Sequence, residues 1–438
     1  MAKVSNTKTR TVRKISKADS IKLPMVEPEA VGMSSERLGR IRVAMQRYVD
    51  KKLVPGVVSL VARKGKVAYL DAVGLQNVED GIPMNPDTIF RIASMTKAIT
   101  SVALMMLFEE GHFLLSDPAS NWIPEFADPK VAIRLPMEER RSESVNVGGT
   151  PIKLIPANRP ITIRHLLTHT AGFGNVPRGI SAEQWAKVNE RQKPDETIGD
   201  WVKRYAKVPL NHQPGEVWDY SRATCVVGHL VEIMSGMTLD EFFRERIFKP
   251  LNMPDTHFFL PLNKLDRFAA CYTPDKDLKI KLTDAPTPKS RFVREPHTYF
   301  MGSGGLVSTV KDYFRFYQMT LNGGELEGAR ILSRKTLELM TSIHTGDLPV
   351  WLPGPWSGFG LGFGVVRNTE HINTLTSVHQ GPSPWSVGSY SWGGAFCTFP
   401  WADPKEKLIG IMMTQVGPYN HLNIRQEYIS LAYQAIID

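Results

Sequence analysis

β-Branched and other apolar residues gather in short runs near both ends of the chain. Residues 57–62 and 67–70 form two such runs, and the polar segment 63–66 separates them, which predicts a β-hairpin. Three later runs predict strands close to the C-terminus: residues 362–366, 394–399 and 408–413. We therefore expect a sheet to which both ends of the chain contribute strands.

Apolar positions at helical spacing predict helices elsewhere. Residues 34–51 carry such a stripe at Leu38, Ile41, Met45 and Val49. Ser34 or Ser35 is the expected N-cap of that helix. Residues 94–110 are apolar on most faces, so this helix is expected to be buried and to end at Gly111. Further helical patterns occur at residues 230–234, 239–248 and 422–436.

This order of elements predicts an α/β (α+β) fold. We expect an antiparallel sheet flanked by helices, with a mostly helical lobe inserted into it. The predicted division is a basic tail over residues 1–24, an α/β lobe over 25–93 plus 300–438, and a helical lobe over 94–299. The polar, unpatterned residues 128–160 are predicted to form a long inserted loop. A cleft between the lobes is the expected binding site.

Composition places the chain among ordinary globular proteins. Of its 438 residues, 42% are hydrophobic and 22% are charged, a balance that excludes disorder throughout. No apolar run reaches about 18 residues, so no membrane span is expected. Cys225, Cys271 and Cys397 are odd in number and far apart, which excludes a disulfide framework. With no secretory signal before Pro24, these features favour a cytoplasmic protein.

The net charge of +9 lies mostly at the N-terminus. Residues 1–24 contain seven Lys and Arg residues and one Asp, so they carry +6 and leave +3 for the rest of the chain. We expect a solvated or loosely docked tail, with an organellar transit peptide as the alternative. Because no binding motif accompanies this charge, no nucleic-acid partner is expected.

The first candidate for chemistry is the Ser-x-x-Lys sequence of Ser94 and Lys97, at the start of the buried helix. Residues three apart share a helix face, so the hydroxyl and the amine can meet. The helix N-terminus favours negative charge on an oxygen, and burial would make the lysine a usable base. The pattern recurs at residues 5–8, in the tail, and at 308–311, where it is predicted to open a Ser-capped surface helix.

Two further segments could complete such a site. Tyr220 follows the turn at Pro214-Gly215, and a tyrosine beside a buried ammonium can take a proton from a serine. The segment of Trp392, Gly393, Gly394 and Ala395 has two glycines in a predicted strand, which indicates close backbone approach and N–H groups that could bind a carbonyl. The alternatives are a packed aromatic and an ordinary kinked strand.

Other patterns favour structural roles. His165 and His169 have metal-ligand spacing but lack the Glu of a zinc-protease motif, so we interpret them as structural and expect no metal. The glycines of residues 358–364 do not form a dinucleotide-binding fingerprint. No Gly-x-Ser-x-Gly sequence occurs, which argues against an α/β-hydrolase nucleophile elbow.

Taken in order, the motifs resemble those of the serine β-lactamase and penicillin-binding-protein superfamily, above all class C β-lactamases and family VIII carboxylesterases. The resemblance covers about residues 30–437 and rests on six segments: 90–97, 166–172, 214–221, 304–309, 321–324, and 392–394 followed by Asp403-Pro404. It implies the β-lactamase/transpeptidase-like fold, with an α/β lobe made from the chain ends.

The resemblance also implies roles. Ser94 corresponds to the nucleophile, Lys97 to the lysine of the base network, and Tyr220 to the tyrosine that activates the serine and protonates the leaving group. Residues 392–394 correspond to the third motif that lines the cleft. The N–H groups of Ser94 and Ala395 would form the oxyanion hole. The implied chemistry is acyl transfer through a Ser94 acyl-enzyme, without metal or cofactor.

The chain departs from the lactamase pattern in two places. Trp392 stands where β-lactamases usually carry the Lys of Lys-Thr-Gly, and Arg222 stands where the second motif usually ends in Asn. Both changes weaken recognition of β-lactams or D-Ala-D-Ala. Cys397 occupies a position that is often Gly in the esterase branch and is expected to narrow the site. Aromatic residues suggest an apolar pocket wall or core packing: Trp351, Trp356, Phe359 and Trp385.

The expected function is therefore that of a serine carboxylesterase acting on esters with small acyl or alcohol groups. An acyltransferase or amidase acting on a specialised metabolite is the alternative, since the same acyl-enzyme serves both. A β-lactamase, a D-Ala-D-Ala peptidase and a non-enzymatic scaffold are less favoured. The expected partner is a small-molecule ester, while the natural substrate, the acyl-chain preference and the oligomeric state stay open.

Overall fold

The structure is a computed structural model that describes residues 22–135, 145–147, 150–174, 179–190, 192–352, 357–367 and 384–438. Most of the basic tail lies outside the described residues, and with it the Ser-x-x-Lys pattern of residues 5–8. Trp356 also lies outside them. The predictions made for these residues therefore stay predictions, as does the division of the chain into lobes.

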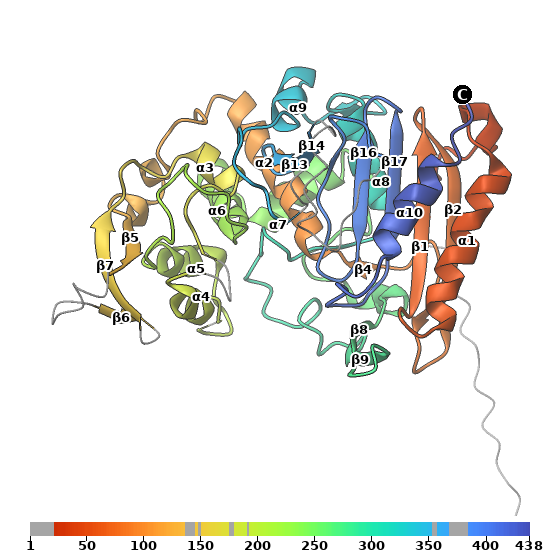
Figure 1. Ribbon diagram of the computed structural model, residues 1–438, viewed down its shortest axis with the longest axis horizontal. Coiled ribbons are helices and arrows are strands. Elements are labelled where there is room, and N and C mark those ends of the chain that lie inside the picture. The colour runs from red at the N-terminus through yellow and green to blue at the C-terminus, as the bar shows by residue number, and fades with distance from the viewer. Residues whose placement is uncertain are drawn as a thin grey trace, which may run out of the picture.

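Strands from both ends of the chain form one antiparallel sheet, as predicted. Its order is β13-β14-β15-β16-β17-β1-β2-β3, so β1 pairs with β17 and β2 on its two edges. The strands span Ser357–Phe359 (β13), Gly364–Val366 (β14), Tyr390–Ser391 (β15), Phe399–Asp403 (β16), Leu408–Met413 (β17), Gly56–Arg63 (β1), Lys66–Asn77 (β2) and Ile82–Pro83 (β3). Figure 1 shows the red-orange β1 and β2 beside the blue β16 and β17.

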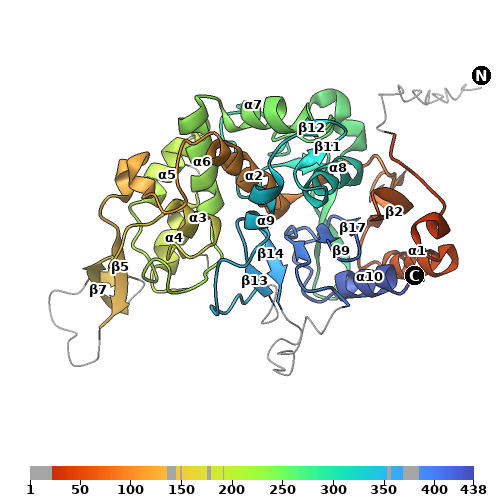
Figure 2. The same cartoon turned by 90° about the horizontal axis from the view of Figure 1, so that it is seen from above.

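Helices cover both faces of this sheet. α1 packs against α10 and β2, whereas α8 packs against β16 and β17. In Figure 2, α8 and α10 lie on opposite sides of β17. The helices span Ser35–Asp50 (α1), Thr96–Glu109 (α2), Ile163–Leu167 (α3), Ala182–Val188 (α4), Ile198–Tyr205 (α5), Ala223–Ser235 (α6), Leu239–Phe243 (α7), Val310–Leu321 (α8), Arg334–Met340 (α9) and Ile424–Tyr433 (α10). The mixed α/β fold with a large antiparallel sheet confirms the predicted class.

The predicted first helix and hairpin form for the expected reasons. Ser34 is the N-cap of α1, and its side chain accepts a hydrogen bond from the N–H of Arg37. Leu38, Ile41 and Met45 of the predicted stripe are buried. All eight residues of β1 are buried, because this strand has neighbours on both edges and helices on both faces. The apolar side chains of α1 and of one face of the hairpin belong to one of the two large cores, and those of the other face belong to the second.

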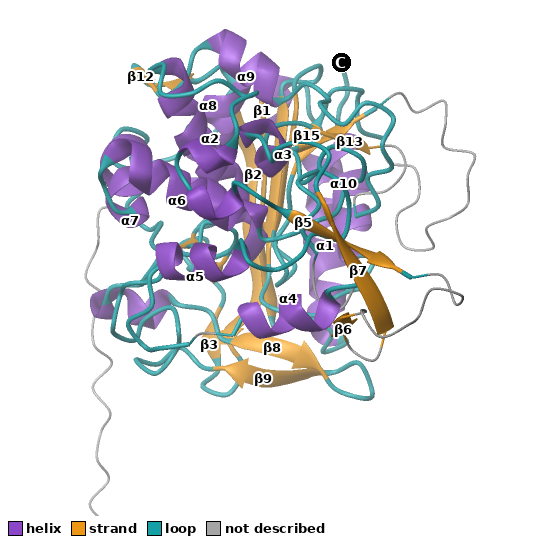
Figure 3. Ribbon diagram, turned by 90° about the vertical axis from the view of Figure 1, so that its left-hand side faces the viewer, coloured by secondary structure: helices purple, strands orange, loops and turns teal. Residues whose placement is uncertain are grey.

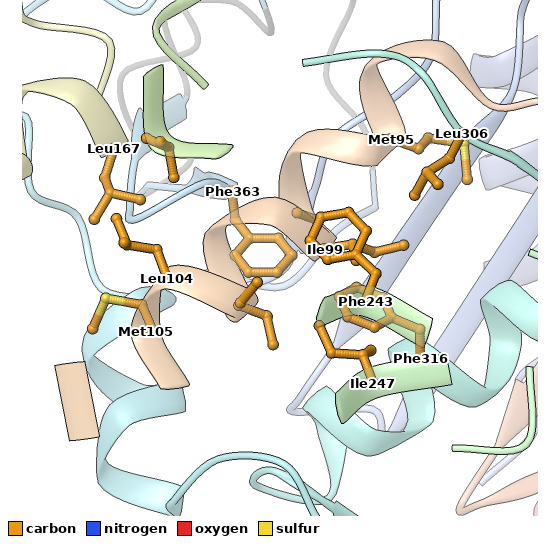
Figure 4. Packing of buried hydrophobic residues seen from close by; sticks show 14 of the residues in the cluster. Met95, Ile99, Leu104, Met105, Leu167, Phe243, Ile247, Leu306, Phe316 and Phe363 are labelled. Carbon is orange, nitrogen blue, oxygen red and sulfur yellow. The ribbon is translucent and has the colours of Figure 1, made fainter. Parts of the chain in front are cut away.

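The second large core surrounds α2. Residues 96–107 of this helix are all buried, as its apolar character on most faces predicted. α2 packs against α6 and α7, and α7 continues as a π-helical turn over Arg244–Phe248. Figure 4 shows Met95, Ile99 and Leu104 interleaved with side chains from several other segments. Because it is enclosed on all sides, α2 is a rigid base for residues at its N-terminus.

The prediction of a long loop over residues 128–160 is wrong for the described part. Three strands, Lys130–Arg134 (β5), Val145–Val147 (β6) and Thr150–Pro156 (β7), form a small antiparallel sheet. The backbone of β5 also exchanges hydrogen bonds with Leu210 at 2.8 and 2.9 Å. The strands are short and lack a regular alternation of apolar and polar residues, so tertiary pairing determines their structure more than local pattern does.

Two other expectations need correction. The strand predicted over residues 394–399 begins only at Phe399, because Gly394 N–H donates to the Thr398 carbonyl (2.8 Å) and closes a turn. The helix after Ser308 is not a Ser-capped surface helix. Thr309 is the cap of α8, and most of α8 is buried against the sheet.

The remaining strands connect the helical part to the sheet. β4 (Phe90–Arg91) pairs with β10 (Val307–Ser308), and β8 (Cys271–Pro274) pairs with β9 (Ile280–Asp284). Figure 3 shows β8 and β9 beside β3 at one end of the main sheet. The hairpin β11–β12 spans Glu325–Leu326 and Ala329–Arg330. Among the described residues, no helix has the length and apolar character needed to cross a membrane.

Candidate active site

Ser94 lies at the junction between a short strand and the buried helix. β4 leads into a 3₁₀ turn, Ala93–Met95, after which α2 begins. Within residues 88–107, Ser94 is the one residue that is not buried. Ala93 has a φ of 44°, in the left-handed region that a non-glycine residue seldom adopts. The junction therefore exposes the Ser94 side chain from a segment that is otherwise packed inside the protein.

The structure brings Ser94, Lys97 and Tyr220 together. The Tyr220 hydroxyl donates to Ser94 Oγ at 2.8 Å. Lys97 Nζ donates to Ser94 Oγ at 3.4 Å and to the Ser303 carbonyl at 2.6 Å. It also lies 4.7 Å from the centroid of the Tyr220 ring, a cation–π distance. The three predicted residues thus form one network centred on Ser94 Oγ.

Lys97 has an unusual environment for a lysine. Its side chain is nearly enclosed, since the residue is only 4% exposed. No carboxylate within the described ranges lies at ion-pair distance from Nζ, and both of its hydrogen-bond acceptors are neutral. Ser303 is itself fixed by the Cys225 thiol, which donates to Ser303 Oγ at 3.0 Å. An ammonium held here without a counter-charge would stabilise negative charge on the neighbouring oxygen atoms.

His169 holds the segment that carries Tyr220. Its carbonyl accepts from the N–H of Asp219 (2.9 Å), and its Nδ1 accepts from the N–H of Ser221 (3.4 Å). The histidine therefore contacts the backbone on both sides of Tyr220, and its ring lies 5.0 Å from the tyrosine ring. Complete burial, with a smaller effect of the Lys97 charge, holds the pKa of His169 well below its usual range. The ring is thus neutral, as an acceptor at Nδ1 requires.

Trp392 completes the aromatic surroundings of Tyr220. Its Nε1–H donates to the Tyr220 hydroxyl at 3.3 Å, and the two rings are 5.1 Å apart. Trp392 also packs edge-on against Phe359 at 5.1 Å, in a small cluster that includes Trp218. The tryptophan thus supplies a neutral hydrogen-bond donor and no formal charge at the position where related motifs carry lysine.

Gly393, Gly394 and Ala395 lie beside Ser94, after β15, where the 394–398 turn begins. A Cβ atom on Gly394 would overlap Thr398 Oγ1 and the Ile92 carbonyl oxygen. A Cβ atom on Gly393 would lie 3.0 Å from a guanidinium nitrogen of Arg425. The two glycines therefore mark a close backbone approach, as predicted, although they follow the strand and do not lie inside it.

A pocket of about 420 Å³ opens at Ser94. Its wall contains both polar site residues and a larger apolar surface. The lining residues are Ser94, Tyr220, Leu352, Trp385, Ser391, Trp392, Gly393, Gly394, Ala395, Phe399, Pro418, Tyr419, Asn420, Arg425, Gln426 and Ile429. All predicted site residues except Lys97 line this pocket, and Lys97 reaches it through Ser94 Oγ. Of the two alternatives left open for Trp385, both apply: it forms part of the wall and packs against the core, stacked on Phe399 at 6.0 Å.

Cys397 does not narrow the site. It is fully buried in the core beneath α10 and is absent from the pocket wall. Its φ of 62° lies in the left-handed region that favours glycine. Backbone conformation, not space in the pocket, therefore accounts for a position at which the esterase branch often has Gly.

The histidines with metal-ligand spacing have structural partners. His165 Nδ1 accepts from the N–H of Thr162 and thereby caps α3, and His169 fixes the Tyr220 segment. In the part of the chain that the structure covers, no group of three or more His, Cys, Asp or Glu side chains could hold a metal ion. The expectation that the protein uses no metal or cofactor stays a prediction.

The sequence did not indicate two residues that organise the site. Motif reasoning identified His169 as structural but gave no sign that it contacts the backbone on both sides of Tyr220. Arg425 was not singled out, although its guanidinium lines the pocket and donates to the turn beside Ser94. The sequence feature that could have indicated Arg425 is its place in the first turn of the C-terminal helix, where a positive charge opposes the helix dipole.

Comparisons with known proteins agree with the geometry. The Beta-lactamase family model matches residues 41–434. Protein Rv1367c of Mycobacterium tuberculosis (strain ATCC 25618 / H37Rv) is 31% identical over 388 residues, which cover 86% of this chain and 90% of that protein. Esterase EstB of Burkholderia gladioli is 28% identical over 388 residues, which cover 85% and 88% of the two chains.

Among solved structures, EstCE1, described as a hydrolase with promiscuous acyltransferase activity, superposes with a TM-score of 0.72 at 23% identity. The superposition covers 92% of this chain and 99% of that chain. This likeness shows the fold alone. The family model and the sequence relatives show common ancestry. The chain therefore belongs to the beta-lactamase family, within the superfamily of serine β-lactamases and penicillin-binding proteins.

Proposed function

We propose that this protein is a serine hydrolase that cleaves carboxylic esters through an acyl-enzyme on Ser94. The observation that carries the proposal is the hydrogen bond of 2.8 Å between the Tyr220 hydroxyl and Ser94 Oγ, beside the enclosed Lys97. A serine hydroxyl is a weak nucleophile until a neighbouring base takes its proton. Tyr220 is the side chain placed to do so, and Lys97 stabilises the negative charge involved.

The first half of the reaction makes the acyl-enzyme. The Tyr220 oxygen, as phenolate, takes the Ser94 proton while Ser94 Oγ attacks the ester carbonyl. The tetrahedral oxyanion collapses, the bond to the alcohol oxygen breaks, and Tyr220 returns the proton to that oxygen. In the second half, water gives a proton to Tyr220 and attacks the acyl carbonyl, after which Ser94 Oγ leaves and is reprotonated. Each half uses the same proton acceptor, so one tyrosine suffices.

The turn beside Ser94 supplies the oxyanion site in this proposal. Ala395 lines the pocket with Ser94, and among the hydrogen bonds of the described residues none has the Ala395 N–H as donor. The N–H of Ser94 lies at the start of α2, where the helix dipole favours negative charge. Donors fixed in advance at the developing charge commonly supply the largest share of such catalysis.

The pocket supports a small ester with an apolar group. Its volume of about 420 Å³ lies within the range of small-molecule sites, about 300–1,000 Å³. Trp385, Phe399 and Ile429 form an apolar wall beyond the turn. Trp392 brings no cation to the position where β-lactamases hold a substrate carboxylate, so recognition of β-lactams is less favoured. The name of the relative EstB also supports ester hydrolysis.

Acyl transfer to an alcohol or amine is the second candidate. The described activity of the structural neighbour EstCE1 favours it, since that hydrolase has promiscuous acyltransferase activity. The same acyl-enzyme would form, and a bound alcohol or amine would replace water in the second half. An apolar pocket that limits the access of water to the acyl group would favour this outcome.

The test measures hydrolysis of p-nitrophenyl acetate and butyrate by the wild type and by the Ser94→Ala variant. We expect Ser94→Ala to lose at least about 10³-fold in kcat. Ser308→Ala is the matched control, because it removes a serine of the same Ser-x-x-Lys pattern outside the pocket. Hydrolysis that survives Ser94→Ala would refute the mechanism. Adding primary alcohols and amines, or replacing the esters with nitrocefin, separates esterase from acyltransferase and β-lactamase.

A further inference from the structure

Arg425 packs beneath the turn that presents Ala395. The residue lies in the first turn of α10, about 30 positions after that turn in the sequence. Its Nη2 donates to the Gly394 carbonyl at 2.8 Å and to the Thr398 carbonyl at 3.0 Å. Gly394 and Thr398 are the two ends of the turn, since the Gly394 N–H donates to the same Thr398 carbonyl. One guanidinium nitrogen thus holds both ends of the turn together.

The surroundings of Arg425 suit no ordinary ion pair. No carboxylate in the described part of the chain lies within ion-pair distance of its guanidinium, and Arg425 is the one charged residue in the pocket wall. Its Cζ lies 4.1 Å from the Tyr419 ring centroid and 5.0 Å from that of Phe399, so the group lies against aromatic rings. A cation in the first turn of a helix also opposes the helix dipole. The nearest hydrogen-bond acceptors of Arg425 are therefore the backbone carbonyls of the turn.

The hydrogen bond to Gly394 acts on the peptide group that carries the Ala395 N–H. The Gly394 carbonyl and the Ala395 N–H belong to one peptide unit, and that unit is trans. In a trans peptide the C=O and N–H bonds point in opposite directions, so the N–H points away from Arg425. A donor on the carbonyl oxygen also polarises the unit and makes its N–H a stronger donor.

The geometry points to Arg425 as the positioning residue of the oxyanion site: it fixes the 394–398 turn and polarises the peptide whose N–H binds the oxyanion. This inference rests on the proposed function. Arg425 touches neither the nucleophile nor the reacting carbonyl, so it acts through the Gly394–Ala395 peptide. The contact with Gly393 fits the same role, because a Cβ atom there would lie 3.0–3.2 Å from the guanidinium and would displace it.

The test compares Arg425→Met with Arg425→Lys on p-nitrophenyl butyrate, a neutral ester. Removing an oxyanion donor outright commonly costs about 10²–10³-fold in kcat. Arg425→Met leaves the Ala395 N–H in place but makes it a weaker and less firmly held donor. We therefore expect a smaller loss, about 10- to 30-fold in kcat, with KM little changed. Arg425→Lys keeps the charge and one donor, and its kcat should lie between those of Arg425→Met and the wild type.

The second measurement separates positioning from a purely structural role. Phenylboronic acid forms a tetrahedral adduct on a catalytic serine, and the adduct places an oxygen where the oxyanion develops. Its Ki should rise by the factor that kcat loses, whereas the KM of the neutral ester should change little. A loss of packing alone would weaken binding of both the boronic acid and the ester, or of neither.

Arg63→Met is the control for the loss of a buried arginine. Arg63 Nη1 likewise donates to two carbonyls, those of Val31 and Gly32 at 3.1 and 3.0 Å, and it also pairs with Glu406 and Asp438 outside the pocket. This variant should lose thermal stability and keep kcat. The inference is overturned if Arg425→Met hydrolyses the neutral ester with the kcat of the wild type. A variant that raises only the KM of an anionic ester would also overturn it, because Arg425 would then bind a substrate charge and not position the turn. If Ser94→Ala retains activity, it is the proposed function that fails.

Discussion

Two segments of the molecule carry the same Ser-x-x-Lys pattern, and they lie next to each other. Residues 94–97 follow β4 and residues 308–311 extend from β10, and these two strands pair with each other. Each segment leads into a buried helix, α2 or α8. The local sequence and the local fold are therefore alike, whereas the contacts of the two serines and the two lysines differ.

The difference lies in what surrounds the side chains. Ser94 Oγ contacts Tyr220 and Lys97, whereas Ser308 Oγ is buried and shares a hydrogen bond of 2.8 Å with Thr256 Oγ1. Lys97 has neutral acceptors only, whereas Lys311 forms an ion pair of 2.7 Å with Asp87. The Asp87 carboxylate thus occupies the Lys311 ammonium. The spacing brings the two groups within reach, and the third partner determines whether they can react.

The second segment also supports the first. Tyr313, in α8, donates to the Met95 carbonyl at 2.8 Å, and Met95 directly follows the nucleophile. The Leu306 N–H donates to Thr96 Oγ1 at 3.1 Å, which ties the chain before β10 to the first residue of α2. We therefore expect substitutions at the second segment to lower stability and those at the first to lower activity.

The sharpest test exchanges each lysine for methionine. Lys97→Met removes the cation beside Tyr220, and we expect kcat for ester hydrolysis to fall by about 10³-fold, in the range of acid–base groups. Lys311→Met breaks the ion pair with Asp87 and should cost less than about 1 kcal/mol of the free energy of unfolding. Its kcat should stay within about twofold of wild type. Equal losses of activity in both variants would contradict the distinction between the segments.

A tyrosine pair gives the next largest contrast. Tyr220→Phe removes the group that takes the Ser94 proton and should lower kcat by about 10²–10³-fold. Tyr313→Phe removes a buried hydrogen bond to the Met95 carbonyl, which costs about 1 kcal/mol of stability. We expect its kcat to change by less than about fivefold, because the turn is also held by β4. Steady-state kinetics and urea unfolding of both variants measure the contrast.

The sequence alone predicted much of this arrangement, and its errors have physical causes. The sheet from both chain ends and the buried helix α2 followed from periodicity, whereas the joint role of Ser94, Lys97 and Tyr220 was implied by the resemblance to the superfamily. The burial of α8 did not, because several of its polar residues, among them Asp312 and Arg315, have buried partners that the sequence does not show. Arg425 was missed because its acceptors are carbonyl groups, which every residue has, so no side-chain motif marks them.

Removing the serine hydroxyl of the second segment, in Ser308→Ala, should have a smaller effect, on stability alone. Ser308→Ala leaves the Thr256 hydroxyl with Asp312 Oδ2 as its remaining partner at 2.8 Å, so no buried donor is orphaned. We expect a loss of about 1 kcal/mol in the free energy of unfolding and an unchanged kcat. Thermal unfolding and p-nitrophenyl butyrate hydrolysis of the same preparation measure both. A loss of activity without a loss of stability would assign Ser308 a chemical role.

The last expected effect leaves activity unchanged and concerns Asp312, whose carboxyl group shares Thr256 as a hydrogen-bond partner with Ser308. Burial, and then the neighbouring Asp255 charge, raise the pKa of Asp312 to about 7. Between about pH 4 and pH 7 the folded protein keeps this proton while the unfolded chain, with an ordinary Asp pKa, releases it. Stability from this group is therefore complete below about pH 4 and declines as pH rises toward 7.

Asp312→Asn has no proton to lose. Across the same window, the unfolding free energy of the wild type should therefore fall relative to that of the variant, by on the order of 1–3 kcal/mol. Urea unfolding of both proteins at pH 5 and pH 8 measures this difference. Lys97, Tyr220 and Ser94 keep their contacts in Asp312→Asn. The ratio of the kcat of this variant to the kcat of the wild type should therefore not depend on pH. Parallel stability changes in the two proteins would show that Asp312 ionises normally, and the second segment would then lack the buried carboxylic acid that separates it from the first.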